Sequence, residues 1–114
     1  MIHEMRLNND PFNKIKKGTK TVELRLLDEK RKALRIGDKI IFTNKDTNEK
    51  IDVIVKGLFK ANNFDDIYKK YSKEVMGYSD EEVANPKDME KYYSIEEINK
   101  YGTLAIEIEK VLKW

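Results

Sequence analysis

The middle of the chain carries the pattern that most limits its fold, namely two apolar runs separated by a short polar segment. Residues 39–44 and 50–61 are rich in β-branched and aromatic side chains, and residues 45–49 are Lys-Asp-Thr-Asn-Glu. Side chains alternate across a strand, and Asp and Asn favour turns, so these residues predict an antiparallel hairpin. Gly57 falls within the second run and predicts a bulge there.

Further strands and helices follow from similar patterns along the rest of the chain. Residues 1–7 and 103–112 predict two more strands, and the alternation in the last one predicts one buried and one exposed face. A helix is predicted after Asp10 as its N-cap, and Gly18 is its expected C-cap. Residues 62–101 predict a helical insert, with capping boxes that start at Ser79 and Ser94. Strand, helix, three strands, helical insert and strand together indicate an α+β fold.

The stretch Gly18–Arg25 places three charged residues in what otherwise reads as a strand. Glu23 and Arg25 are two residues apart and share one face, whereas Lys20 nominally shares the opposite, apolar face. Lys20 is compatible with this pattern if it precedes the regular strand or if the strand bulges. Two interpretations stay open: an edge strand with solvated charges, or a cleft in which the three charged groups meet a polar ligand.

Composition excludes several classes of function. The 114 residues suit one domain, and the chain has no cysteine and a single histidine, His3. We therefore expect no metal centre, and we expect no cofactor because no phosphate-binding glycine motif is present. No apolar run is long enough to span a bilayer, and no signal-peptide core is apparent, so we expect a cytoplasmic protein without membrane contact.

The net charge of +2 is small, but the charges are unevenly distributed. The first third of the chain is basic, whereas residues 65–109 are rich in acid, which predicts one basic face. Six tyrosines in the insert either pack its helices or offer stacking surfaces for unpaired bases. The tyrosines are Tyr68, Tyr71, Tyr78, Tyr92, Tyr93 and Tyr101.

The segment Gly18-x-Lys20-x-x-Glu23-x-Arg25 resembles the G-x-K-x-x-E-x-R signature of the ASCH domain, a relative of the PUA domain. A preceding helix, Ile36-Gly37-Asp38 before an apolar strand, and Tyr101-Gly102-Thr103 before the last strand also resemble the family, in its order. The resemblance covers nearly the whole chain. It implies a single domain over residues 1–114 with a PUA-like fold, a small mixed β-barrel with helices capping its openings.

The resemblance implies two kinds of activity. One branch of the family removes the acetyl group from N4-acetylcytidine, which makes Lys20 the implied catalytic lysine. Glu23 occupies the position where that branch has a threonine, and Glu74 is the candidate third member, with Glu81, Glu82 and Glu90 comparable. The other implication is RNA binding, with single-strand ribonuclease activity in part of the family.

Two hypotheses follow for the cleft. In the first, the chain binds RNA or a nucleotide through the signature segment, and Gly18, Thr19 and Thr21 join the three charged residues as ligand-binding groups. In the second, the chain is a hydrolase of a modified nucleoside, in which Lys20 activates the attacking group and a glutamate moves protons. In both cases we expect a monomer or weak dimer.

Overall fold

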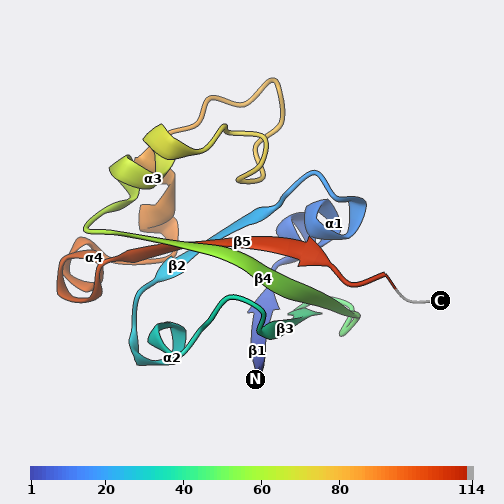
Figure 1. The fold of residues 1–114 in the computed structure, drawn as a ribbon. Helices are drawn as coiled ribbons and strands as arrows, with labels where there is room; N and C mark the ends of the chain where they lie inside the picture. Colours follow the sequence, from blue (N-terminus) through green and yellow to red (C-terminus); the bar gives the residue numbers. More distant parts are fainter. Residues whose placement is uncertain (113–114) are drawn as a thin grey trace.

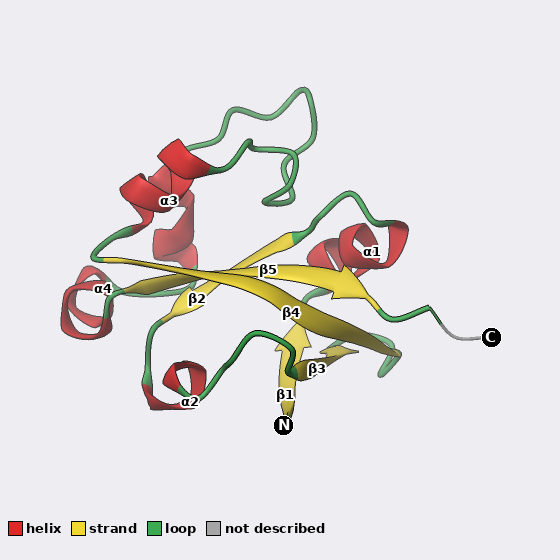
Figure 2. Ribbon diagram, in the orientation of Figure 1, coloured by secondary structure: helices red, strands yellow, loops and turns green. Residues whose placement is uncertain are grey.

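The structure is a computed structural model that describes residues 1–112 (Figure 1). Its strands are β1 (Ile2–Leu7), β2 (Val22–Leu26), β3 (Lys39–Asn44), β4 (Lys50–Ala61) and β5 (Thr103–Lys110). Its helices are α1 (Asn9–Lys17), α2 (Glu29–Lys32), α3 (Phe64–Lys70), the 3-10 helix η1 (Pro86–Lys91) and α4 (Ile95–Tyr101). One sheet with helices placed around it confirms the predicted α+β class (Figure 2).

All five strands form one mixed sheet in the order β1-β3-β4-β5-β2. β1 pairs with β3 in parallel, and the other neighbours are antiparallel. The predicted β3–β4 hairpin is present, and the register between β4 and β5 shifts between Val55 and Gly57, as the glycine predicted. A Cβ atom at Gly57 would lie 2.9 Å from the carboxyl group of Glu107, so the bulge also makes room for that side chain.

The sheet curls until its two edge strands face each other. The Arg25 side chain on β2 donates through Nη2 to the Arg6 carbonyl on β1 at 2.9 Å. Lys30 on α2 donates to the Glu4 carbonyl on the same strand at 2.6 Å. Within residues 1–112 no backbone ladder joins β1 to β2. The predicted barrel is therefore a half-barrel, and side chains bridge the seam between β1 and β2.

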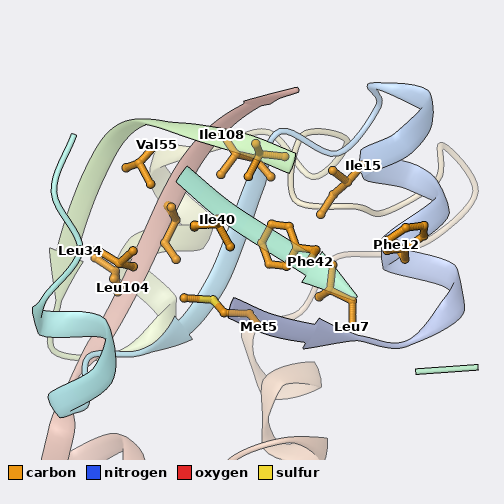
Figure 3. Close-up of a cluster of buried hydrophobic side chains, with 12 residues drawn as sticks. Met5, Leu7, Phe12, Ile15, Leu34, Ile40, Phe42, Val55, Leu104 and Ile108 are labelled. Carbon is orange, nitrogen blue, oxygen red and sulfur yellow. The ribbon is translucent and has the colours of Figure 1, made fainter. Parts of the chain in front are cut away.

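The inner face of the curled sheet holds the main hydrophobic core (Figure 3). Phe12 and Ile15 of α1 pack against it, three residues apart as a helix face requires. Phe42 of β3 lies near them, and Leu34 closes the opposite end beside Leu104 (Figure 3). α1 thus covers one opening of the half-barrel.

A second core lies between the outer face of β2 and β5 and the insert, residues 62–101. Val22, Leu24 and Ala105 of the sheet pack there against Phe64 and other side chains of the insert. The prediction that one face of the last strand is exposed is therefore wrong over the first half of β5, where Ala105 is fully buried. The physical reason is the insert, which covers an outer face that would otherwise meet water.

The start of α1 differs from the prediction. α1 begins at Asn9 with Asn8 as its N-cap, so Asp10 is not the cap. Asp10 lies in the first turn and pairs with Lys14 at 3.0 Å, which gives its charge a different role. Gly18 ends α1 with a left-handed φ of 89°, as predicted.

The two predicted capping boxes in the insert have different outcomes. Ser94 and Glu97 form both reciprocal hydrogen bonds, and α4 follows them, which confirms the prediction. Ser79 donates its backbone N–H to Glu82 Oε1 at 2.8 Å, but no helix follows. The chain forms a turn here and then runs to Pro86, which begins η1. The box residues therefore stabilise a turn and do not start a helix.

Candidate functional site

Lys20 is held at the junction between α1 and β2. The strand begins only at Val22, so Lys20 precedes it and its side chain need not follow the strand alternation. Its ammonium donates to the carbonyls of Val22 and Met76 at 2.9 and 2.8 Å. Its third partner is Glu23 Oε1 at 3.3 Å. Two donors of this buried ammonium therefore have carbonyl acceptors, and its charge is paired with a carboxylate.

Glu23 and Arg25 point to the inner face of the half-barrel. Their partners across the ladder are Ile106 and Leu104, which belong to the main core. Arg25 contacts Glu23 Oε2 through both Nε and Nη2 at 2.8 Å. Glu23 is only 5% exposed, so the interpretation of an edge strand with solvated charges is wrong for this residue. The strand is an edge of the sheet, but its charges form a buried network.

The charges of Glu23 and Arg25 are stabilised by their neighbours in the network. Burial opposes ionisation of Glu23, but the Lys20 ammonium and the Arg25 guanidinium outweigh it and hold the pKa of Glu23 below 4.5. Burial likewise opposes the charge of Arg25, yet Glu23 raises the pKa of that guanidinium. One carboxylate between two cations leaves a net charge of about +1 on the network at neutral pH. An anionic or electron-rich ligand is the complement of such a charge.

The same junction fastens the insert to the sheet. Besides the contact of Lys20 with Met76, Lys14 donates to the Gly77 carbonyl at 2.6 Å. The backbone N–H groups of Thr21 and Val22 both donate to the Val75 carbonyl. The loop after α3 is therefore fixed beside the signature segment, and it forms one wall of the space above the charged network.

A cleft of about 610 Å³ lies between the end of β1, the start of α1, β2 and the insert. Its walls carry cations, carboxylates and tyrosines in one continuous surface. The cations are Arg6, Lys14, Lys20, Arg25, Lys45 and Lys91. The carboxylates are Asp10, Glu23, Glu82 and Asp88, and the tyrosines are Tyr68, Tyr78, Tyr92 and Tyr93.

Two of the tyrosines form a hydrogen-bonded row in the insert wall. The hydroxyl groups of Tyr68 and Tyr78 lie 2.7 Å apart, and Tyr78 donates to Asp88 Oδ2 at 2.7 Å. Burial raises the pKa of both phenols above 10, so they stay neutral at physiological pH. Tyr92 differs, because it lies at the rim and is 59% exposed. The wall thus combines fixed polar groups with one accessible aromatic ring.

The structure brings together part of the predicted site. Lys20, Glu23 and Arg25 all line the cleft. The predicted ligand-binding residues Gly18, Thr19 and Thr21 do not line it: Gly18 and Thr19 are exposed at the end of α1, and Thr21 uses its backbone to hold the insert.

Among the glutamates predicted from the insert, only Glu82 lines the cleft. Glu74 is exposed and outside the cleft lining, as are Glu81 and Glu90. Glu82 lines the rim with a half-exposed side chain, 3.9 Å from Lys14. Glu74 was chosen because its position loosely matches the family pattern in the insert. Which glutamate of the insert faces the cleft depends on how the insert folds.

Sequence reasoning did not single out four lining residues, Arg6, Lys45, Asp88 and Lys91. Arg6 lies near the end of a predicted strand and Lys45 in a predicted hairpin turn, positions that are usually solvated. The predicted basic character of the first third of the chain includes Arg6 but not Lys45. Asp88 and Lys91 come from η1, whose position depends on the tertiary contacts of the insert.

The described part of the chain, residues 1–112, offers neither a metal-binding cluster nor a membrane-spanning helix. Within this range no group of three or more histidine, cysteine or acidic residues could hold a metal ion. No helix in the same range is long and apolar enough to cross a bilayer.

Comparison with known proteins places the chain among relatives of the same architecture. It is similar to the crystal structure of hypothetical protein PH0355, with 33% identity, a TM-score of 0.81, and coverage of 97% of this chain and 100% of that chain. It is similar to the solution NMR structure of protein PF0455 from Pyrococcus furiosus, with 32% identity, a TM-score of 0.71, and coverage of 99% and 100%.

The chain also shares its fold with a more distant structure and matches one protein family. The crystal structure of ASCH from Zymomonas mobilis shares the fold at 13% identity, with a TM-score of 0.66 and coverage of 95% of this chain and 66% of that chain. No curated protein matches the chain at a significant level. The ASCH domain family matches residues 5–112, nearly the whole chain, and the ordered motifs and the half-barrel agree with it. The chain therefore belongs to the ASCH domain family.

Proposed function

We propose that this chain is an RNA-binding domain that holds one unpaired nucleotide of a single strand in the cleft. The observation that carries the proposal is the meeting of cations and tyrosine rings in a space of about 610 Å³. Sites for small ligands commonly measure about 300–1,000 Å³, which suits one nucleotide and excludes a duplex. Membership of the ASCH family also favours nucleic acid as the ligand class.

The cations of the cleft suit a phosphate group. The Lys20–Glu23–Arg25 network supplies a fixed net positive charge at one wall. Arg6 and Lys45 lie at the same opening, and within residues 1–112 neither side chain has a carboxylate partner. Unpaired cations beside a fixed charge attract a phosphodiester at little cost of reorganisation.

The tyrosines suit the base of the same nucleotide. Unpaired bases bind by stacking on aromatic rings, and one such stack contributes about 1–3 kcal/mol. Tyr92 is the accessible ring at the rim, beside Tyr93 with ring centroids 6.5 Å apart. Asp88 accepts a hydrogen bond from Tyr78 through one oxygen, which leaves acceptor capacity for an amino group of a base.

The hydrolase alternative has less support from this geometry. A lysine that acts as a base or nucleophile needs a nitrogen free of its structural partners. The Lys20 ammonium donates to two backbone carbonyls, one of them from Met76 in the insert, and its charge is paired with Glu23. Glu74, the proposed third member, is exposed outside the cleft. We therefore expect no release of acetate from N4-acetylcytidine, and turnover that is lost in Lys20→Ala would reverse this preference.

The binding proposal is tested by fluorescence anisotropy with a labelled single-stranded RNA hexamer of random sequence. Tyr92→Ala should weaken binding about 5-fold to 150-fold, which corresponds to the loss of one base stack. Ile95→Ala is the matched control, since Ile95 is also exposed in the insert but does not line the cleft. No binding by the wild type, or an equal loss in both variants, would overturn the proposal.

A further inference from the structure

A second concave surface continues from the cleft along the seam. It is a groove of about 630 Å³ between β1, α2 and the β3–β4 hairpin. Arg6, Arg25 and Lys45 line both the cleft and this seam groove. A chain-like ligand with one unit in the cleft can therefore enter the seam groove without leaving the protein surface.

The seam groove has almost a single sign of charge. Six cations line it against one carboxylate, Glu4. They are Arg6, Arg25, Lys30, Arg31, Lys45 and Lys50. Arg25 and Arg31 are paired with Glu23 and Asp28, whereas the other four form no ion pair within residues 1–112. For a chain with a net charge of only +2, this groove concentrates the positive field.

The backbone of β1 along the seam favours a phosphate chain over a peptide strand. An added peptide strand would need the free carbonyl and N–H groups of an open sheet edge. Two carbonyls of β1 already accept hydrogen bonds across the seam, Glu4 from Lys30 and Arg6 from Arg25. These bonds also hold two cationic groups in fixed positions. Positive charge is thus preorganised where backbone acceptors are already occupied.

We propose that the seam groove binds the phosphate backbone of the nucleotides that flank the one in the cleft. This inference rests on the proposed function and extends it from one nucleotide to a strand of at least three. Arg6 and Lys45 lie at the junction between the cleft and the groove, and Lys30 and Lys50 contact phosphates farther along the seam. Their contribution is electrostatic and independent of base identity.

The test measures RNA length and salt dependence together. Labelled random-sequence RNAs of one, three and six nucleotides are titrated against the wild type and Lys30→Gln/Lys50→Gln. Each phosphate contact on a single strand gives a slope of about −0.7 in log K against log salt. At 0.1 M salt, one such contact therefore raises the affinity about fivefold relative to 1 M salt. The double variant should lose roughly 25-fold for the hexamer and about 1.4 in slope, while binding of the mononucleotide stays unchanged.

Two further variants separate the loss of contacts in the seam groove from a general effect of net charge on RNA affinity. Lys60→Gln/Lys87→Gln changes the net charge equally, but neither residue lines the cleft or the groove, so hexamer affinity should change less than about twofold. Lys50→Gln alone loses only a contact to Thr43, so it keeps the seam intact and should show about half the effect in log K.

Each outcome bears on a different claim. Affinity that does not increase from one to six nucleotides, or an equal loss in the control, overturns the seam groove while the cleft proposal stands. No binding at any length overturns both proposals. Displacement of the hexamer by a hexaglutamate peptide at equal concentration overturns the assignment to RNA and identifies an acidic peptide as the ligand.

Discussion

The charge of Glu23 should be essential for the stability of this domain. Glu23→Gln preserves the size and shape of the side chain, so it creates no cavity. It removes the single carboxylate between Lys20 and Arg25, both of which lie in the same buried network. The variant therefore leaves two cations close together without a counter-charge.

The expected loss in the free energy of unfolding follows from the burial of the network. Removing one partner of a buried ion pair costs about 3–5 kcal/mol, because the remaining charge is left without compensation. Arg25 is 14% exposed and keeps its bond to the Arg6 carbonyl, so water and backbone recover part of this cost. We expect a loss of about 3–4 kcal/mol, or roughly 10–20 °C in Tm for a domain of this size.

Urea unfolding at pH 7 measures the effect. Glu90→Gln is the control, since Glu90 is exposed and lies outside the cleft, and it should change the free energy of unfolding by less than about 0.5 kcal/mol. Combining Glu23→Gln with Lys20→Met removes one of the two uncompensated cations. The double variant should therefore lose about 1–3 kcal/mol less than the sum of the single losses.

The pH dependence gives an independent check on the same carboxylate. Because the folded-state pKa of Glu23 lies below 4.5, its ionised form contributes stability above that pH. This contribution is lost as the pH falls through the lower folded-state value. The wild type should lose more stability on acidification than Glu23→Gln does. Losses below about 1 kcal/mol at pH 7 together with identical pH profiles would refute the reasoning.

Three other predictions concern positions outside the cleft. Hydrogen bonds from His3 and the backbone lower the pKa of Asp38 to about 2, so the ionised carboxylate stabilises the fold above pH 3.8 and this contribution disappears between pH 3.8 and about 2. Acid titration followed by circular dichroism should show a flatter stability profile for Asp38→Asn than for the wild type. An unchanged profile would contradict this prediction. Gly18→Ala meets no atom within 4 Å but keeps a φ of 89°, so calorimetry should show a loss of about 1–2 kcal/mol from backbone strain alone. Tyr71→Phe removes the 2.7 Å bond to Glu107 and should cost about 1 kcal/mol in urea unfolding, whereas no change would mean that water replaces the hydroxyl fully.

Local chemistry made much of the secondary structure predictable. The β3–β4 hairpin, the end of α1 at Gly18 and the start of α4 at Ser94 depend on contacts between near neighbours in the chain. The bulge at Gly57 forms in the pairing with β5, but the glycine itself marked its position. The box at Ser79 had the same local signal but formed only a turn. A capping pair stabilises a helix start only where the following residues gain burial by continuing as a helix.

The signature segment was predictable in its residues but not in its environment. Alternation indicated correctly that Glu23 and Arg25 share a face, and the glycine before Lys20 indicated an irregular entry to the strand. Whether those charges meet water depends on what lies across the seam and beneath the insert. Lys20 is 6% exposed because a carbonyl from Met76, 56 residues away in sequence, reaches its ammonium.

The sequence by itself thus determined the family, the α+β class, the strands and the charged triad, since each depends on residue types at short spacing. Only the tertiary structure decided that the sheet stays open between β1 and β2, and that the insert turns Asp88 and the tyrosines, but not Glu74, towards the cleft. Burial and long-range hydrogen bonds are set by which distant segments pack together. Residue spacing along the chain does not predict which distant segments pack together.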